Sequence, residues 1–539
     1  MEAHTSPDLL TEPDEEVHLG CLHDETAATD PDRTALIDGE SGDTVTYGEL
    51  SDRIAAAGNT LANMGVETGD RVALCVSNQL GFLYVFFGAA RLGAVPVPVN
   101  IETTREKMVS VARDSDARVI IAGADEKILE DVRAIVDAVD AVATVGVLSA
   151  DLPIIDDVEL VSFNERRAAA ATTLEPASVH RDDPAMQPYT SGSTGKPKGV
   201  VLTHAGCHWM ITSINKLHFL DENERAIVAG PLYHKNAMVG AVKPMLTVGG
   251  SVVIMDGFDP TRVIKSINNY GVTYLRGVPA MYKMLVNADD ALADHDVSSV
   301  QWAVSGSASL PQSLIKSVRD TFGCEMGEAY GLTETGGPVT LSPRWGPRKL
   351  GSSGLALPGA DVRIIDPDTN EELSPGETGE FVVSCPSNGQ YYHRPEKQRE
   401  AYFRRDGKTF LHTDDLARQD EQGYHYIVGR LDDMLIVGGE NVYPAEVEDR
   451  IQQHDAVEDV AVVGIPHEIK GEAPVAFVVA TDVTEQQLKQ HTLETGPAYA
   501  HPRQIFLLKE LPLASTGKID RETLEEMAHD RLDGEITRD

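Results

Sequence analysis

A short stretch rich in glycine, hydroxyl groups and lysine constrains this chain more than any other. It runs from Tyr189 to Val200 and reads YTSGSTGKPKGV, with three Gly, two Lys and four Ser or Thr residues. Glycine permits positive φ, so backbone N–H groups can turn toward one point. Hydroxyl and ammonium donors around that point complete a nest for an anion, and a polyphosphate is the expected ligand. The expected donors are Thr190, Ser191, Gly192, Ser193, Thr194, Gly195, Lys196 and Lys198.

Two familiar phosphate loops do not fit this stretch. A Walker loop requires G-x-x-x-x-G-K-[ST], whereas Gly192 and Gly195 lie closer together and Pro197 follows Lys196. A Rossmann loop requires G-x-G-x-x-G, which the stretch lacks. A flexible surface loop is the competing interpretation, and the order of the two Lys and the Pro disfavours it.

Short apolar runs alternate with amphipathic stretches from Thr34 onward. Asp70–Val76 and Ala94–Asn100 are predicted as strands, with an apolar helix from Phe82 to Leu92 between them. This alternation predicts α/β layers with a largely parallel sheet. In residues 140–182, Asp-rich turns and a polar, Ala-rich run predict an irregular connection between two subdomains.

The glycine-rich stretch resembles the signature loop of the adenylate-forming superfamily, which includes acyl-CoA synthetases, aryl-CoA ligases, firefly luciferase and peptide-synthetase adenylation domains. Every position from Thr190 to Gly199 fits the family pattern, and the resemblance spans about residues 34–524. It is closest to AMP-forming acyl-CoA ligases. It implies an α/β fold, with a large N-terminal domain of layered sheets and helices and a small mobile α+β C-terminal domain. The expected division is a disordered acidic leader (1–17), a large ATP- and acyl-binding domain (18–431) and a small domain (432–539) with a hinge at Asp432.

Composition excludes several other classes of protein. No apolar run reaches the ~18–20 residues that a membrane span needs, and the polar, acidic first 16 residues do not form a signal peptide. The five Cys residues are scattered without a CxxC pair, so neither a metal site nor a disulfide framework is indicated. A reducing cytoplasm is the expected location.

The formal net charge of −39 is the other unusual property of the chain. Such a surface repels nucleic acid and anionic membranes, so neither is an expected partner. The acidic residues are spread along the chain, as in proteins kept soluble in concentrated salt, where self-repulsion is screened. We therefore hypothesise a halophilic source.

A second motif, EAYGLTE, runs from Glu328 to Glu334. By resemblance, Tyr330 stacks on adenine, Thr333 binds the α-phosphate, and Glu334 binds Mg²⁺ together with Thr190. A Tyr ring offers a broad face at low entropic cost, and a carboxylate is a hard ligand that suits Mg²⁺. The neighbours Glu328, Ala329 and Gly331 are expected to contact the nucleotide.

Two further segments are assigned to the site by the same resemblance. His234, in the run Pro-Leu-Tyr-His, borders the acyl pocket and the adenylate, where an imidazole can orient a carboxylate. The alternative is a capping His at the end of a strand. Small residues allow a purine to approach the backbone, so Gly306, Ser307 and Ala308 are expected at the adenine face. The alternative there is an ordinary strand-to-helix turn.

The run His412–Ala417 resembles the Thr-Gly-Asp element of the family, which places Asp415 at the ribose hydroxyls. Asp414 stands where Gly is usual, so the backbone there is expected in a left-handed conformation that Asp tolerates. That change leaves open whether Asp414 or Asp415 holds the ribose. Arg430 is assigned to the ribose or phosphate, as an always-charged partner of an anion.

The resemblance also assigns two mobile elements of the small domain. Gly438, Gly439 and Glu440 belong to a loop that touches the pantetheine arm of coenzyme A during thioester formation. Lys518, in Thr-Gly-Lys-Ile, is the expected catalytic lysine. As a point charge it would offset negative charge on the α-phosphate and pyrophosphate oxygens.

Together these residues predict an AMP-forming acid–thiol ligase that uses ATP, Mg²⁺ and coenzyme A. A medium or longer fatty acid is the first expectation for the acid, and an aryl acid the second. Competing hypotheses are a ligase that loads a carrier protein, a luciferase-like oxygenase and a nucleotide-binding regulator without chemistry. The intact Glu334 and Lys518 argue against the regulator. The oligomeric state is left open, with a homodimer as one possibility.

Overall fold

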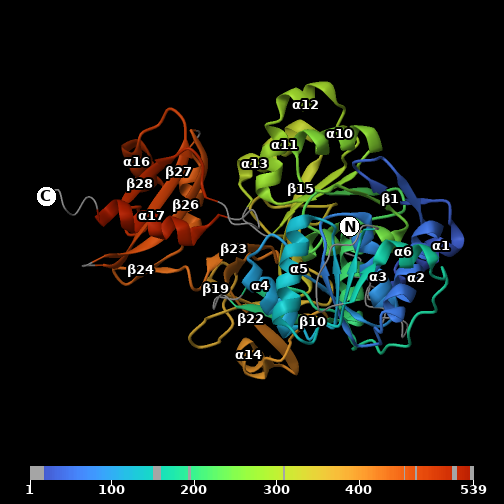
Figure 1. The fold of residues 1–539 in the computed structure, drawn as a ribbon. Helices are drawn as coiled ribbons and strands as arrows, with labels where there is room; N and C mark the ends of the chain where they lie inside the picture. Colours follow the sequence, from blue (N-terminus) through green and yellow to red (C-terminus); the bar gives the residue numbers. More distant parts are fainter. Residues whose placement is uncertain are drawn as a thin grey trace, which may run out of the picture.

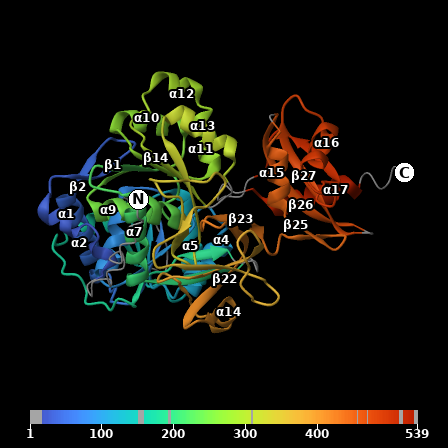
Figure 2. The same cartoon turned by 180° about the vertical axis from the view of Figure 1, so that it is seen from behind.

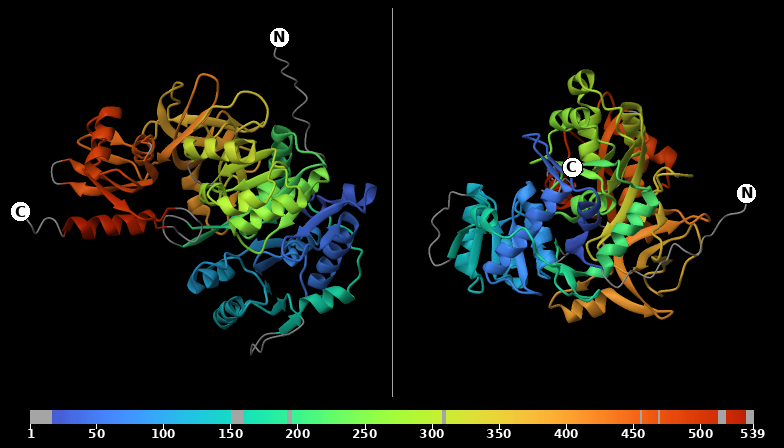
Figure 3. Two further views of the ribbon diagram at one scale, coloured as in Figure 1. Left: turned by 90° about the horizontal axis from the view of Figure 1, so that it is seen from above. Right: turned by 90° about the vertical axis from the view of Figure 1, so that its right-hand side faces the viewer.

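The computed structural model describes residues 17–149, 159–191, 196–306, 310–454, 456–467, 470–512 and 519–533. The chain forms a large domain of several layered sheets and a smaller domain at one end of the molecule (Figures 1 and 3). Apart from Val17, the predicted acidic leader lies outside the described residues.

The centre of the large domain is a nine-stranded sheet. Its strands β1, β12, β11, β13, β14 and β15 pair in parallel, and β2, β16 and β17 add antiparallel edges. Near-continuous burial along β1, β11, β12, β13 and β14 suits a sheet covered on both faces. The sheet order is β17-β16-β15-β14-β13-β11-β12-β1-β2, with bounds β1 (Thr34–Asp38), β2 (Thr44–Thr46), β11 (Arg225–Val228), β12 (Ser251–Ile254), β13 (Tyr274–Gly277), β14 (Trp302–Gly306), β15 (Glu325–Leu332), β16 (Gly337–Leu341) and β17 (Leu355–Ala356).

A second sheet of the large domain has five strands, all parallel, in the order β4-β3-β5-β6-β7. The predicted irregular connection in residues 140–182 is wrong over part of its length, because β6, β7 and helix α6 belong to this sheet layer. Pairing with distant strands overrides the weak local pattern there. The bounds are β3 (Arg71–Cys75), β4 (Val95–Pro98), β5 (Val119–Ala122), β6 (Thr144–Val147), β7 (Glu159–Ser162) and α6 (Phe163–Ala169).

Helices pack on both faces of these sheets. Helix α2 begins with a capping box between Thr46 and Glu49, and buries Leu50, Ile54 and Leu61, which recur at helical spacing. With α3, α7 and α9 it forms a core shared by the two sheets, while α10 to α13 cover the other face of the nine-stranded sheet (Figure 1). The helices and short turns of the large domain are η2 (Leu19–Cys21), α1 (Asp24–Thr29), α2 (Tyr47–Asn63), α3 (Leu80–Arg91), α4 (Arg105–Asp114), α5 (Glu126–Ala138), α7 (His204–His218), α8 (Lys235–Ala237), η3 (Met238–Val242), α9 (Lys243–Val248), α10 (Pro260–Tyr270), α11 (Pro279–Val286), α12 (Asp289–Asp294), α13 (Gln312–Phe322) and α14 (Pro395–Ala401).

Two antiparallel groups of strands complete the large domain. One contains β18, β19, β22, β21 and β23, and the other joins β20, β10 and β8 with β9 beside β10. The parallel sheets therefore agree with the prediction, while these strands add an antiparallel layer. Their bounds are β8 (Pro184–Met186), β9 (Tyr189–Ser191), β10 (Pro197–Thr203), β18 (Asp361–Ile365), β19 (Thr378–Ser384), β20 (Gln390–Tyr391), β21 (Tyr402–Arg405), β22 (Lys408–Gln419) and β23 (His425–Arg430).

The small domain is a five-stranded sheet with helices on both faces. Helices α15 and α16 cover one face and α17 the other. The sheet order is β25-β24-β27-β26, with β28 beside β27. The bounds are β24 (Leu435–Val437), β25 (Glu440–Val442), α15 (Pro444–Gln452), β26 (Val457–His467), β27 (Gly471–Ala480), α16 (Glu485–Thr495), β28 (Gln504–Leu508) and α17 (Arg521–Asp533).

The chain leaves the large domain after β23 and enters the small-domain sheet at β24 (Figure 1). Asp432 lies in the turn between these strands. Across the boundary, the Lys283 Nζ of α11 lies 3.4 Å from the Asp459 Oδ2 of β26, and it donates to the Glu458 carbonyl at 3.3 Å. Contacts between the domains are therefore polar in part.

Candidate active site

Two paired strands flank the predicted phosphate cradle in the chain. Strands β9 and β10 pair so that Thr190 lies opposite Lys198 and Ser191 opposite Pro197. The Tyr189 hydroxyl donates to the Asp114 Oδ2 at 3.0 Å, which anchors the hairpin to the end of α4. Lys196 is exposed. Of the predicted donors, Gly192, Ser193, Thr194 and Gly195 lie outside the described residues.

Glu334 is tied to this hairpin through Tyr391. The Tyr391 hydroxyl donates to the Glu334 Oε1 at 2.9 Å, and the Gly389 N–H donates to the Glu334 carbonyl at 2.7 Å. Tyr391 lies on β20, and it pairs with Val200 of β10. Burial raises the pKa of Tyr391, and the Glu334 carboxylate raises it further, so the phenol stays a hydrogen-bond donor. Sequence reasoning missed Tyr391, because it lies 57 residues from Glu334 and outside any motif.

The predicted adenine and ribose residues lie together. The Tyr330 hydroxyl donates to the Asp415 Oδ2 at 2.6 Å, and its ring packs edge-on against Phe381 with centroids 4.9 Å apart. Asp415 and Arg430 are cross-strand partners on β22 and β23, with Oδ1 and Nε 4.0 Å apart. Burial, followed by the charge of Asp415, raises the pKa of Tyr330 well above its usual value.

Asp414 adopts the left-handed backbone that the sequence predicts, with φ at 57°. Its carbonyl accepts a hydrogen bond from the Leu431 N–H at 2.7 Å. This contact fixes the end of β23, directly before the crossing into the small domain. Burial raises the pKa of Asp414, and repulsion by Glu380 adds to the effect.

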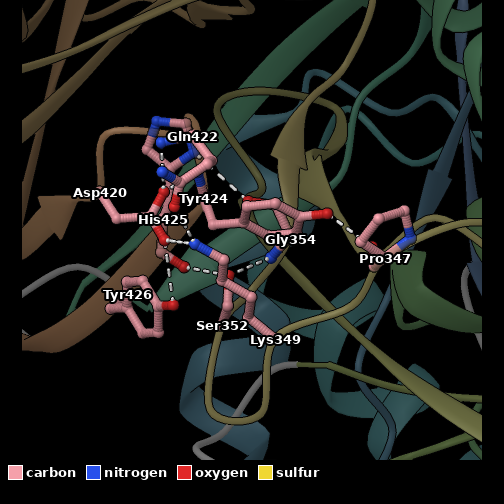
Figure 4. A network of polar contacts seen from close by, with 9 residues as sticks. All are labelled: Pro347, Lys349, Ser352, Gly354, Asp420, Gln422, Tyr424, His425 and Tyr426. Atoms are coloured by element: carbon pink, nitrogen blue, oxygen red, sulfur yellow. Dashed lines mark hydrogen bonds and ion pairs between the residues drawn. The ribbon is translucent and has the colours of Figure 1, made fainter. Parts of the chain in front are cut away.

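A polar network anchors the hairpin formed by β22 and β23 to the loop that precedes β17 (Figure 4). Lys349 pairs with Asp420, the Tyr424 hydroxyl donates to the Pro347 carbonyl at 2.5 Å, and the Ser352 hydroxyl donates to the His425 carbonyl at 2.8 Å. Partial burial opposes the ionisation of Asp420, but donation from Lys349 and from backbone N–H groups outweighs it and lowers the pKa to about 2. The network therefore holds the hairpin that carries Asp415 and Arg430 to the rest of the large domain.

His234 is a capping residue, but it caps the start of helix α8 and not the end of a strand, as the alternative interpretation expected. Its Nδ1 accepts from the Asn236 N–H at 3.2 Å. The residues that follow connect this segment to two strands, because Lys235 Nζ donates to the Leu332 carbonyl and Asn236 Oδ1 accepts from Arg276 Nε at 2.8 Å. A cap also fixes the ring, so a role beside the substrate remains compatible with this geometry.

Small residues bring strands close together at the carboxyl edge of the central sheet. Gly306 pairs with Ala329, and a Cβ on Gly306 would lie 3.1 Å from the Ala329 carbonyl oxygen. A Cβ on Gly331 would lie 2.0 Å from the Gly337 carbonyl oxygen, so Gly331 is required for this approach. Ser307 and Ala308, the rest of the predicted adenine face, lie outside the described residues.

Glu328 lies at the boundary between the domains. Burial raises its pKa to about 8, with repulsion by Asp449 of α15 as the second cause. At neutral pH the group is therefore largely a carboxylic acid, which can donate as well as accept a hydrogen bond. This environment differs from the solvated acid expected of an exposed strand end.

Not all of the small-domain residues that the sequence assigns to the site lie near the predicted phosphate cradle in this structure. Gly438 and Gly439 have φ of 66° and 90° and form the two-residue turn between β24 and β25. This turn, with Glu440 at its end, lies at the tip that points away from the large domain (Figures 1 and 2). Lys518 lies outside the described residues, between Pro512 and Asp520, which are joined by a hydrogen bond of 2.9 Å.

The donor set of this site suits a metal bound mainly by phosphate. In the described part of the chain, no cluster of three or more His, Cys, Asp or Glu side chains could hold a metal alone. Mg²⁺ commonly uses one or two protein oxygens together with substrate phosphates. A single oriented carboxylate, Glu334, linked through Tyr391 to the strand that follows the predicted phosphate cradle, fits that pattern. Among the helices of the described chain, none combines the length and apolar composition needed to cross a bilayer.

Comparison with known families agrees with this arrangement. Residues 23–393 match the AMP-binding enzyme family, and residues 446–518 match the AMP-binding enzyme C-terminal domain. The chain belongs to the AMP-binding enzyme family. As a member of this family it binds ATP, and it is an ATP-dependent, AMP-forming acid–thiol ligase.

Curated relatives of this AMP-binding enzyme extend over nearly its whole length. A feruloyl-CoA synthase of an Amycolatopsis species is 34% identical, covering 93% of this chain and 97% of that protein. A long-chain-fatty-acid–CoA ligase of Mycobacterium tuberculosis is 31% identical, covering 94% of this chain and 98% of that protein. The two relatives act on acids of different classes, so family membership alone leaves the acid undetermined.

Solved structures show the same fold. An anthranilate CoA ligase in complex with anthranoyl-AMP has a TM-score of 0.86 and is 28% identical, covering 95% of this chain and 97% of that one. An ATP-bound enzyme of Rhodopseudomonas palustris has a TM-score of 0.85 and is 29% identical, covering 95% of this chain and 98% of that one. Both domains of this chain are therefore those of an AMP-binding ligase.

Proposed function

We propose that this AMP-binding enzyme converts a carboxylic acid with an apolar body into its coenzyme A thioester, with Mg²⁺ as the metal. A fatty acid is the first candidate and an aryl acid the second. The link from Glu334 through Tyr391 to strand β10 carries the proposal, because it connects the carboxylate predicted to bind the metal to the strand that follows the predicted phosphate cradle. The fatty-acid and feruloyl-CoA relatives support the two substrate classes.

In the first step, a carboxylate oxygen of the acid attacks the α-phosphorus of ATP. The new bond joins the acid to AMP, and the bond to pyrophosphate breaks. The cradle donors and Thr333 would bind the phosphate oxygens, with Lys518 opposite the growing negative charge. Mg²⁺, bound by Glu334 and Thr190, would neutralise part of the phosphate charge. Tyr391 orients the Glu334 carboxylate, and Asp415 with Arg430 would hold the ribose.

In the second step, the thiol of coenzyme A attacks the acyl carbon of the acyl adenylate, AMP leaves and the thiol proton passes to solvent. We propose that the small domain rotates about Asp432 between the two steps. Support comes from the chain path, because the turn at Asp432 is where the chain passes from one sheet to the other. The rotation would withdraw Lys518 and bring the Gly438–Glu440 turn toward the site.

The proposal is tested by measuring pyrophosphate and AMP release with a panel of fatty and aryl acids, with and without coenzyme A. We expect pyrophosphate release with the correct acid and thioester only when coenzyme A is present. Acyl adenylate that accumulates with coenzyme A and is consumed only by a carrier protein would favour the carrier-loading hypothesis. Failure to release AMP from any acid would contradict the proposal.

The cytoplasmic location, the halophilic source and a homodimer remain predictions.

A further inference from the structure

Asp114 is a carboxylate in an unfavourable place that contacts two segments of the predicted nucleotide site. It is the last residue of α4, and its side chain is 13% exposed. A carboxylate is disfavoured at the carboxyl end of a helix, where the backbone carbonyl groups carry partial negative charge. A largely buried carboxylate also needs partners that replace its water. The partners of Asp114 therefore explain why an acid stands here.

The first partner of Asp114 opens β9, the strand that precedes the predicted phosphate cradle. The Tyr189 hydroxyl donates to the Asp114 Oδ2 at 3.0 Å. Gly199, the cross-strand neighbour of Tyr189 on β10, leaves room for the ring: a Cβ there would lie 3.0 Å from the Tyr189 Cζ. Burial raises the pKa of Tyr189, and the charge of Asp114 raises it further, so the phenol stays a donor. Thr190, a predicted ligand of Mg²⁺, is the next residue of the strand.

The second partner of Asp114 follows β20, the strand that orients Glu334. Arg394 pairs through its Nη2 with the Asp114 Oδ1, three residues after Tyr391. Between the two, the Tyr392 N–H donates to the Gly199 carbonyl at 2.8 Å. The segment that carries Tyr391 is therefore bound to β10 through its backbone and to α4 through Arg394.

The two oxygens of Asp114 thus serve different parts of the predicted site. Oδ2 accepts from the strand before the cradle, and Oδ1 from the segment whose Tyr391 holds the Glu334 carboxylate. Helix α4 itself has no need of an acid at this position, since Ala is a better helix former than Asp. The carboxylate is therefore explained by the two segments that it joins.

We propose that Asp114 is a positioning residue for the β- and γ-phosphates of ATP. It fixes β9 relative to the segment after β20, and thereby the cradle relative to Glu334. It acts through Tyr189 and Arg394 and not on the substrate itself. The inference rests on the proposed function, which assigns these phosphates to the cradle. AMP lacks both phosphates, so the loss of Asp114 weakens the binding of a polyphosphate nucleotide and spares AMP.

The test compares the dissociation constants of two nucleotides in the full-length enzyme with Mg²⁺, measured by calorimetric titration. One is α,β-methylene-ATP, whose bond to the pyrophosphate group cannot break, and the other is AMP. Asp114→Ala should raise the Kd of α,β-methylene-ATP roughly tenfold or more, and that of AMP less than about twofold. Asp131→Ala is the matched control, because it removes the ion pair of Asp131 with Arg105 at the other end of α4. It should leave both constants unchanged.

Two variants remove one contact each. Tyr189→Phe keeps the ring beside Gly199, and Arg394→Gln keeps a polar side chain without the charge. Each should raise the Kd of α,β-methylene-ATP by less than Asp114→Ala does. Adding Tyr189→Phe to Asp114→Ala should have little further effect, since both remove the same contact.

Thermal unfolding shows which variants fold, and Tyr189→Phe tests the contact even where Asp114→Ala does not. An unchanged Kd of α,β-methylene-ATP in the folded variants would overturn the inference. Equal losses for α,β-methylene-ATP and AMP would do the same, because they indicate a general structural role. Absence of pyrophosphate release by wild type from every acid would instead remove the proposed function, and the comparison of the two nucleotides would still be valid.

Discussion

The hydroxyl of Tyr391 donates a hydrogen bond to the carboxylate of Glu334 across 2.9 Å, from a strand that pairs with the cradle hairpin. The two residues are 57 positions apart, so only the fold brings them together. We expect this contact to aim one carboxylate oxygen at the metal while leaving the other available. Orientation of a ligand by a second group commonly changes metal affinity by tenfold or more.

Tyr391→Phe should therefore raise the Mg²⁺ concentration needed for half-maximal pyrophosphate release by roughly tenfold. The reason is the loss of the hydroxyl without the loss of the ring. Tyr392→Phe is the matched control, because the Tyr392 hydroxyl donates to Asp116 and not to Glu334. Equal Mg²⁺ dependence in the two variants would show that the contact does not orient the metal ligand.

Lys518→Ala should slow adenylation about 10²–10³-fold, the usual loss when a donor to developing charge is removed. Thioester formation from supplied acyl adenylate should change far less, since the lysine is expected to leave the site for that step. The two half-reactions are measured separately by rapid quench. Lys509→Ala, at an exposed lysine of the same domain, serves as control. Equal losses in both half-reactions would contradict the two-state account.

Glu328 should make the folded protein less stable as the pH rises. Its folded pKa of about 8 lies above the ordinary value of 4.5, so the folded state holds the proton more tightly. The resulting stability is fully present below pH 4.5 and is lost as the pH rises through 8. Thermal unfolding of wild type and Glu328→Gln between about pH 5 and 9 tests this. The Gln variant should lose less stability over this interval, and parallel curves would exclude the effect.

The effect of a substitution at Asp414 on the free energy of unfolding should depend on whether the new residue tolerates the left-handed backbone, and not on the loss of the charge. Glycine accepts φ of 57° without steric cost, so Asp414→Gly should change the free energy of unfolding by less than about 1 kcal/mol. Asp414→Val introduces a β-branched residue into a left-handed conformation and should destabilise by about 1–3 kcal/mol. Urea unfolding of both variants measures the difference. A larger loss in the Gly variant would instead assign the main role to the carboxylate.

The net charge of −39 predicts that the fold depends on salt. Repulsion among unscreened carboxylates opposes the compact state, and salt shortens the range of that repulsion to ~3 Å at 1 M. Circular dichroism should therefore show loss of structure at low salt and recovery on adding KCl. A spectrum that stays the same across the series would count against the halophilic hypothesis.

The sequence is sufficient to predict the features that local chemistry determines. The parallel sheets follow from alternating apolar runs, helix α3 from its apolar run between two strands, and the left-handed Asp414 from its place in a glycine position. The proximity of Tyr330, Asp415 and Arg430 also follows, because each is assigned to the same nucleotide.

Other features depend on contacts that no local pattern records. Strand β7 pairs in parallel with β6. This pairing leaves no local signal, so the sequence pattern there predicts an irregular connection. The pairing of Asn236 with Arg276 and the raised pKa of Glu328 likewise arise between distant segments. The burial of Lys243 gives no signal in the sequence, because it results from the packing of α9 against Met186 and Phe86.

The repulsion between Glu328 and Asp449 has a consequence for how the two domains part. Opposite charges at this boundary would oppose separation of the two domains, whereas the Glu328 and Asp449 carboxylates repel each other once both are ionised. In the proposed rotation about Asp432, loss of the proton from Glu328 would therefore favour separation of the small domain from the large one.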